Sequence, residues 1–378
     1  MDTVTHALVG AAISDCWFRK RLGPVATPFA LAVAALPDID AATYFISAEA
    51  ALMYHRGYTH SFVPMLLAAP LLGWMGYAIS SRRDGWKLWW LLALICLFSH
   101  TIFDLVTSWG TMPLLPFSNA RISWDIVPIL DVFLTSVTLG SFVVNRILRW
   151  ERVDTFLNPL VYPVVHRHPG RQKAGDWIGK IAVALVVAYL LVGWQQNRQT
   201  VRIATEELKN QGIAPVEVRA LPILLTYISY DIAARDAEGT VYNAVYSSYA
   251  PKEMRFRSYP TLSPDEAGEE LATPEAGFFA WYSQDMFVAT KNADATPGRG
   301  VVLHDRRFFT LTDPDASRFV MEFRYDDGGK LSGASLGQRG LRGVNVRDEL
   351  DRLWQLTWRG VGAGKDALEA EDVSLAGE

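Results

Sequence analysis

Histidine and aspartate residues lie inside or beside apolar segments that are long enough to cross a membrane. They occur in four short motifs, Asp2-Thr-Val-Thr-His6, Leu36-Pro-Asp38-Ile-Asp40, His55-Arg-Gly-Tyr-Thr-His60 and His100-Thr-Ile-Phe-Asp104. A charged side chain near the bilayer centre costs about 2.5–3.5 kcal/mol on insertion scales, so such residues need a partner, water or an ion. Histidine and carboxylate side chains together are ligands of divalent metals. The pattern therefore predicts a metal site built into a membrane domain.

Apolar segments of the length that a spanning helix needs, about 20 residues, occur five times. They are residues 25–46, 61–80, 88–107, 127–145 and 178–194. A sixth segment, residues 3–18, is short, so it either spans with help from its neighbours or lies as a half-buried helix. The apolar residues concentrate before residue 195. We therefore expect a multi-pass α-helical membrane domain of five to six helices, followed by a small α+β domain.

The basic residues alternate between loops in a way that predicts orientation. They gather near residues 19–21, 82–87 and 146–173, whereas loops 47–60 and 108–126 carry only Arg56 and Arg121. Because basic loops stay in the cytoplasm, three loops are predicted inside and two outside. The last segment then delivers the C-terminal part to the outside. The His and Asp motifs all fall at one depth, near the outer leaflet.

Four parts follow from this organisation. Residues 1–150 form the helical membrane domain with the His/Asp metal site, 151–177 a basic cytoplasmic loop, 178–195 the last transmembrane helix and 196–378 the extracytoplasmic α+β domain. In the last part, β-branched and aromatic runs between Gly, Pro and Asp turns predict strands within residues 214–249 and 277–336. Residues 346–358 are predicted to form a helix.

The candidate metal ligands are His6, Asp38, His55, His60, His100 and Asp104. His100 and Asp104 are four residues apart, so on a helix they project from one face. Each motif also has an ordinary alternative: a His–Asp hydrogen bond inside the bundle, a helix-capping aspartate beside Pro37, or a solvated loop histidine. Asp125 and Asp131 are weaker candidates, as a further ligand or as an acceptor behind a ligating histidine.

The chemistry expected of such a site is hydrolysis. A divalent ion with an open position lowers the pKa of bound water to about 7. We assign Asp40 as the candidate general base and Arg56 as the candidate clamp for a phosphate. One or two ions are expected, with zinc favoured and manganese or iron open. Cys16 and Cys96 lie outside the motifs, so a thiolate site is not indicated.

The same motifs carry a family resemblance. Met1-Asp2-x-x-Thr5-His6, the Asp38/Asp40 and His55 to Ser61 motifs, and His100-x-x-x-Asp104 followed by Ser108-Trp109-Gly110 resemble the YdjM-type family. The resemblance covers roughly residues 1–150. It implies a bacterial inner (cytoplasmic) membrane protein of a family described, largely by inference, as metal-dependent hydrolases.

A more distant likeness concerns the order of the ligands, which is similar to that in zinc-dependent phospholipase C and the P1-type nucleases. The further His and Glu ligands of those enzymes have no counterpart after Asp104. The likeness implies a phosphoesterase-like reaction at a site with one or two metal ions rather than three.

Three functions fit these observations. The leading hypothesis is a membrane-embedded metal-dependent hydrolase that acts on a phosphoester or other ester of a lipid or lipid-linked substrate at the outer leaflet. The second is an ion- or proton-coupled transporter; clustering at one leaflet argues against it, because a relay needs polar residues through the full depth. The third is a metal-binding structural membrane protein without hydrolytic activity. The net charge of −4 gives no case for nucleic acid as a partner.

Overall fold

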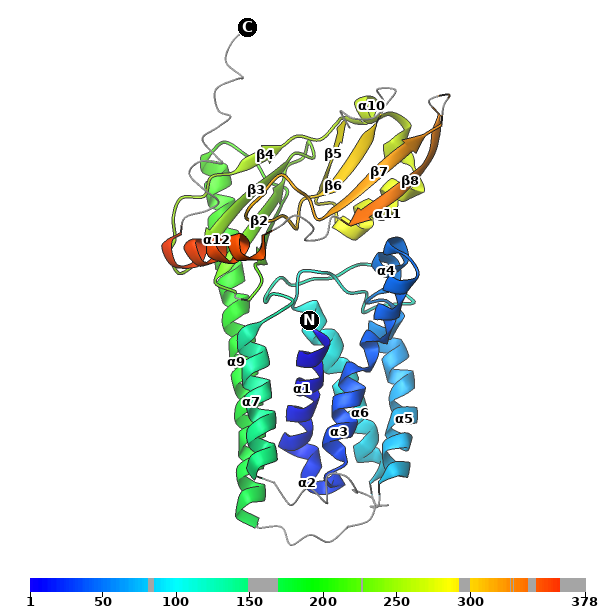
Figure 1. Ribbon diagram of the computed structural model, residues 1–378, viewed down its shortest axis with the longest axis vertical. Coiled ribbons are helices and arrows are strands. Elements are labelled where there is room, and N and C mark those ends of the chain that lie inside the picture. Colours follow the sequence, from blue (N-terminus) through cyan, green and yellow to red (C-terminus); the bar gives the residue numbers. More distant parts are fainter. Residues whose placement is uncertain are drawn as a thin grey trace. The chain divides into compact units, whose positions relative to one another are not determined.

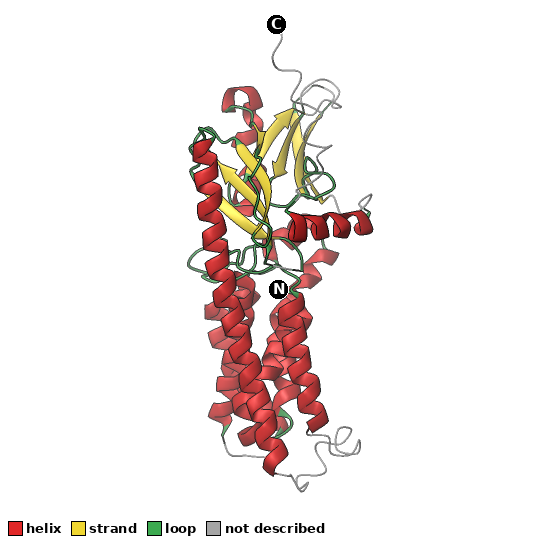
Figure 2. Cartoon of the chain, turned by 90° about the vertical axis from the view of Figure 1, so that its left-hand side faces the viewer, coloured by secondary structure: helices red, strands yellow, loops and turns green. Residues whose placement is uncertain are grey.

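The computed structural model describes the chain except residues 81–84, 149–168, 226, 292–299, 327, 329, 339–344 and 361–378. The chain separates into two compact units. Unit 1 is Met1–Trp194 with Leu224–Thr226, and unit 2 is Gln195–Ile223 with Tyr227–Glu378. Unit 1 is built of helices and unit 2 holds the sheets (Figures 1 and 2). Most of the predicted basic loop, residues 151–177, lies outside the described residues.

Unit 1 is a bundle in which α1 packs on α3 and α7, and α6 packs on α3 and α5 (Figure 1). Trp89, Leu92 and Leu134 are buried at its centre. The elements are α1 (Thr3–Ile13), the π-helix η1 (Ser14–Phe18), α2 (Arg19–Leu22), α3 (Ala26–Ala35), the 3-10 helix η2 (Leu36–Phe45), α4 (Ala48–Tyr54), the 3-10 helix η3 (Tyr58–His60), α5 (Phe62–Ile79), α6 (Trp86–Leu105), α7 (Val132–Leu148) and α9 (Pro169–Asn210).

Three helices of the described chain are long and apolar enough to cross a membrane: Phe62–Ile79, Trp86–Leu105 and Lys173–Asn210. They coincide with three of the predicted spans. Val132–Leu148 is apolar but shorter. Large apolar side chains on the surface of a helix mark a face that meets lipid or a partner. On α5 such exposed side chains are Leu66, Leu67, Leu71 and Trp74.

The other predicted spans are built differently. Residues 25–46 are not one helix, because α3 ends at Ala35 and the tighter η2 follows. Pro37 explains the change, since proline has no N–H to continue the α-helical ladder. Residues 3–18 change from α-helix to π-helix at Ser14, and the segment predicted from residue 127 becomes helical only at Val132. Helix α9 begins at Pro169, inside the stretch predicted as a loop.

Helices α1 and α3 approach closely at Gly10. A Cβ atom added there would lie 2.6 Å from the carbonyl oxygen of Ala30 and 2.6 Å from the Cβ of Ala34. Small residues allow this kind of helix contact in membranes. The carbonyl of Ala34, at the same contact, accepts a hydrogen bond from His100.

We expect the Gly10→Ala substitution to destabilise unit 1 by about 1–3 kcal/mol, because a backbone oxygen and a Cβ cannot turn away from the added methyl group. The matched control is Gly140→Ala on α7, where nothing lies within 4 Å of the added Cβ. The measurement is the midpoint of thermal unfolding in detergent. Equal shifts for the two variants would contradict the close approach of α1 and α3.

Unit 2 contains two four-stranded antiparallel sheets with strand orders β1-β2-β3-β4 and β5-β6-β7-β8. This agrees with the predicted small α+β domain. The strands are β1 (Glu217–Pro222), β2 (Ser229–Arg235), β3 (Val241–Ser247), β4 (Arg257–Tyr259), β5 (Phe287–Lys291), β6 (Val301–Asp305), β7 (Phe319–Tyr325) and β8 (Leu331–Gln338). The helices are α10 (Pro264–Ala267), η4 (Gly268–Ala272), α11 (Pro274–Ser283) and α12 (Val346–Arg359).

One helix of unit 2 begins before, and extends into, a stretch that the sequence predicts to form strands. Residues 277–283 fall in α11, although they lie in a stretch predicted to form strands. The local reason is a helix start: the side chain of Thr273 accepts from the N–H of Ala276, and Pro274 occupies the first turn. The predicted helix at residues 346–358 coincides with α12.

Candidate metal centre

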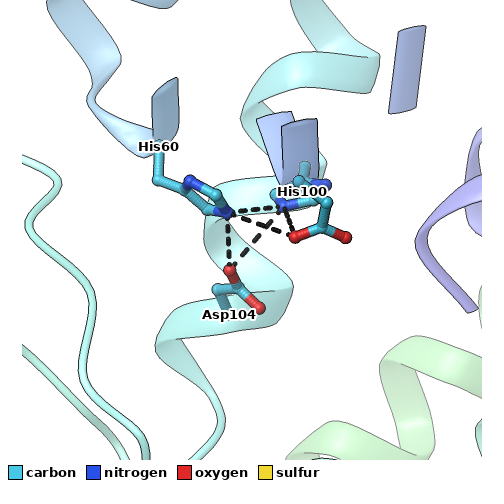
Figure 3. A group of neighbouring side chains, drawn as sticks. His60, His100 and Asp104 are labelled. Carbon is cyan, nitrogen blue, oxygen red and sulfur yellow. Dashed lines mark hydrogen bonds and ion pairs between the residues drawn. The ribbon is translucent and has the colours of Figure 1, made fainter. Parts of the chain in front are cut away.

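Four of the predicted ligands meet in unit 1. Asp38 comes from η2, His60 from η3, and His100 with Asp104 from α6. One ligand atom from each lies within 4.8 Å of the other three. The side chains of His60, His100 and Asp104 are fully buried, and that of Asp38 is 10% exposed. His60 points toward the two residues of α6 (Figure 3). We call these four residues the cluster.

The distances within the cluster are short. His60 Nε2 lies 3.1 Å from Asp104 Oδ2 and 3.6 Å from Asp38 Oδ1. His100 Nε2 lies 3.5 Å from Asp38 Oδ1 and 3.7 Å from Asp104 Oδ2. The two Nε2 atoms are only 2.9 Å apart. Two imidazole nitrogens and two carboxylate oxygens therefore converge on one point.

The Nδ1 atoms of both imidazoles already face acceptor groups. Nδ1 of His100 lies 2.6 Å from the carbonyl oxygen of Ala34, which can only accept, so Nδ1 carries the proton. Nδ1 of His60 lies 3.1 Å from Asp40 Oδ2. In the neutral tautomers that these partners favour, both Nε2 atoms present lone pairs to each other and to the carboxylates. A proton shared between the two Nε2 atoms or a divalent metal bound to both would satisfy these lone pairs, and the donor set fits a metal such as zinc.

Asp40 lies behind His60 rather than beside the point of convergence. Its carboxylate faces His55 Nδ1 at 2.7 Å and His60 Nδ1 at 3.1 Å, and it accepts from the backbone N–H of Arg56 at 3.0 Å and from the hydroxyl of Thr59. With these partners Asp40 holds His60, a candidate ligand, from behind, and its predicted role as general base stays a prediction. His55, predicted as a ligand, is placed against Asp40 and outside the cluster.

Arg56 is buried and adopts a left-handed backbone conformation with φ of 63°. A residue other than glycine rarely does so, and such strain is typical of functional sites. Its guanidinium lies 3.0 Å from Asp104 Oδ1 and donates to the hydroxyl of Thr107 at 2.9 Å. The structure therefore pairs the predicted phosphate clamp with a candidate ligand, whose negative charge it balances.

His6 is placed next to the cluster and outside it. Its Nε2 lies 3.2 Å from Asp104 Oδ1, and its ring stacks on that of His100 with centroids 3.7 Å apart. The amino group of Met1 also contacts Asp104 Oδ1. One oxygen of Asp104 thus faces donors, whereas Oδ2 accepts no hydrogen bond from the described residues and faces the cluster.

Two further aspartates were weaker candidates, and the structure brings neither into the cluster. Asp131 precedes α7, accepts from the N–H of Leu134 at 2.8 Å and from the hydroxyl of Tyr189 at 2.6 Å, and so acts as a helix cap. Asp125 is buried with φ of 53°. Sequence reasoning missed Thr3, whose hydroxyl donates to Asp38 Oδ2 at 2.6 Å.

A second buried polar group lies at the other end of α1. Asp15 accepts from the hydroxyl of Thr27 at 2.8 Å and pairs with the guanidinium of Arg146 at 2.9 Å. Asp15 of this pair lies inside the predicted segment of residues 3–18 and away from the His and Asp motifs. The buried carboxylate of Asp15 is neutralised by the partly exposed guanidinium of Arg146.

Comparison with known proteins gives the family. Residues 1–200 match the sequence model of the YdjM inner membrane protein family. The "Uncharacterized protein YfhP" of Bacillus subtilis (strain 168) is 28% identical over 154 residues, which are 38% of this chain and 46% of that relative. The "Inner membrane protein YbcI" of Escherichia coli (strain K12) is 29% identical over 154 residues, which are 39% of this chain and 88% of that relative. No solved structure matches the chain. With more than half of its length matched, this chain belongs to the YdjM inner membrane protein family.

Proposed function

We propose that this membrane protein is a metal-dependent hydrolase whose divalent ion is held by His60, His100 and Asp104, with Asp38 beside it. One observation carries the proposal. Two buried Nε2 atoms lie 2.9 Å apart, while both Nδ1 atoms are committed to acceptors. A mixed nitrogen and oxygen donor set favours zinc and also suits manganese or iron.

The surroundings of Asp104 favour one ion over two. Its Oδ1 lies 3.0 Å from the guanidinium of Arg56, which carries a permanent positive charge. A second cation beside the same oxygen would be repelled by that charge in a site that excludes water. Asp104 would therefore bind a single ion through Oδ2.

Asp38 is our candidate for the general base, in place of Asp40. A divalent ion in the cluster supplies Lewis acidity and lowers the pKa of a bound water. Catalytic sites keep one position open beside three protein ligands. Asp38 is the cluster member with an exposed fraction above zero, and only one of its oxygens is held by Thr3. Its Oδ1 would take the proton of the attacking water.

A lipid or lipid-linked ester is the proposed substrate class. Large apolar side chains in η2 and directly after it are exposed: Ile39, next to Asp38, is 66% exposed, Phe45 93% and Ile46 76%. Apolar side chains around a polar site suit a substrate with acyl chains. The alternation of basic loops supports a site at the outer leaflet, with unit 2 on the extracytoplasmic side.

The test is hydrolysis by the purified full-length protein in mixed micelles that contain phosphodiester and carboxyl-ester lipids. We expect turnover that a chelator removes and added zinc or manganese restores. Asp38→Asn should lower turnover by roughly 10²–10⁴-fold, the usual contribution of a general base, and should still bind metal. The matched control is Asp131→Asn, a buried helix cap outside the cluster. Stoichiometric metal without turnover of any lipid in the panel would favour a structural metal site.

One observation favours the transporter hypothesis, the pair that the buried Asp15 forms with Arg146 at the other end of α1. A proton relay along this helix would need polar groups between His6 and Asp15. The buried residues between them are apolar up to Ser14: Leu8, Val9, Gly10, Ala11, Ala12 and Ile13. The described part of α1 therefore favours a site at one end over a continuous path.

A further inference from the structure

Helix α12 of unit 2 presents an apolar stripe to its surroundings. Val346, Leu350, Trp354 and Trp358 are spaced four residues apart and are 56%, 47%, 63% and 42% exposed. Residues four apart lie on the same side of a helix. We call these four residues the α12 stripe. Exposed apolar surface of this size on a soluble domain marks an interaction site.

The hydrogen bonds that hold α12 in unit 2 come from residues outside the stripe. Helix α12 is fixed by other residues: the hydroxyl of Thr357 meets that of Ser229 at 2.7 Å, and its carbonyl accepts from Ser247 at 2.8 Å. Near the start of the helix, the carboxylate of Glu349 accepts from the backbone N–H groups of Leu311 and Thr312. The helix is thus docked in one orientation, and this orientation leaves the stripe outward.

The aromatic members of the stripe form a group with a further exposed ring. Trp358 lies edge-on to Tyr249 with centroids 4.8 Å apart, and Trp354 lies 5.4 Å from Trp358. Tyr249 is 62% exposed. Tryptophan and tyrosine combine an apolar ring with a polar group, which is why both concentrate at the headgroup level of bilayers. Arg347 and Arg359 near the two ends of α12 are exposed, as are Asp348 and Asp351, so the aromatic rings rather than the charge suit the headgroup region.

The connection of unit 2 to helix α9 indicates that the stripe can reach a bilayer surface. Helix α9 runs without interruption from the candidate span Lys173–Asn210, and the first strand of unit 2 begins at Glu217. Unit 2 is therefore tethered to a membrane-crossing helix, and this tether raises the effective concentration of bilayer at its surface.

We propose that α12 is an interfacial helix, whose stripe inserts into the headgroup region of the bilayer that α9 crosses. Amphipathic helices with tryptophan and leucine on one face bind in this way. The assignment does not depend on hydrolysis in unit 1. It gives unit 2 a second attachment to the membrane besides α9.

The experiment places an environment-sensitive fluorophore on α12 of the full-length protein. Leu350→Cys on the stripe is compared with Gln355→Cys, an exposed polar position of the same helix. The native Cys16 and Cys96 are buried and serve as the labelling background. Both proteins are reconstituted into vesicles of phosphatidylcholine and phosphatidylglycerol. We expect a blue-shifted emission at position 350 that is quenched by spin-labelled lipid, and at 355 an emission quenched by aqueous iodide.

A second variant tests the aromatic group, and the two quenchers separate lipid from protein as the occupant. Trp354→Ser/Trp358→Ser in the Leu350→Cys protein should abolish the blue shift if the aromatic group holds the helix at the interface. Equal iodide quenching at positions 350 and 355 would overturn the proposal. Protection of position 350 from both iodide and spin-labelled lipid would also overturn it, because a second copy of the chain or another protein would then cover the stripe.

Discussion

Substitution of His60 by alanine is expected to weaken metal binding by at least roughly 100-fold, so that the purified protein loses its stoichiometric ion. Loss of a residue that only orients a ligand typically lowers metal affinity about 10–100-fold, and loss of a ligand lowers it further. His60 faces both carboxylates of the cluster and the Nε2 of His100. Metal content by plasma mass spectrometry, after purification in detergent, measures the effect.

The control removes a histidine of the same chain outside the cluster. His304 lies on β6 of unit 2, where its Nε2 meets the hydroxyl of Thr290 at 3.0 Å. His304→Ala should retain the metal content of the unmodified protein, and elution as a single symmetric species should show that both variants are folded. Wild-type metal content in His60→Ala would place the ion elsewhere. Trace metal in all three proteins would mean that protons, not a metal, hold the two imidazoles together.

The sequence contains the ligand types of the site, but it does not show which of them meet in the cluster and which lie behind it. The spacing of His100 and Asp104 fixes both on one face of α6, because the helical period is local information. Convergence with His60 is different, since it depends on how η3 packs against α6. No local pattern tells which oxygen of Asp104 faces His6 and which faces the cluster. Hence His6 and His55 were predicted as ligands, although the structure places them one layer further out.

The backbone around the site is only partly predictable, because local sequence information does not fix how the chain packs. Pro37 signals an interruption, yet the sequence does not say whether the chain bends, ends or tightens there. In the structure the chain tightens into a 3-10 helix, which places Asp38 beside His60 and Asp40 behind it. The carbonyl of Ala34, which fixes the tautomer of His100, has no signature in the sequence at all, because any residue offers a carbonyl.

The second large effect is expected for Asp40→Asn, which keeps the shape of the side chain and removes its charge. Asp40 accepts from four groups, so an amide with a single acceptor oxygen must leave some of these donors without a partner. His60 then loses the carboxylate that orients it. We expect metal affinity to fall roughly 10–100-fold, with the ion still bound at saturating metal. Competition with a chromogenic chelator measures the dissociation constant.

Asp131→Asn is the matched control, because Asp131 is also a buried aspartate of unit 1 with backbone and side-chain donors. It caps α7 and contacts none of the cluster. It should lower the unfolding midpoint without changing metal affinity. An equal loss of affinity in both variants would mean that Asp40 acts through the stability of the bundle. Unchanged affinity in Asp40→Asn together with lost hydrolysis would instead return Asp40 to the role of general base and leave Asp38 as a permanent fourth ligand.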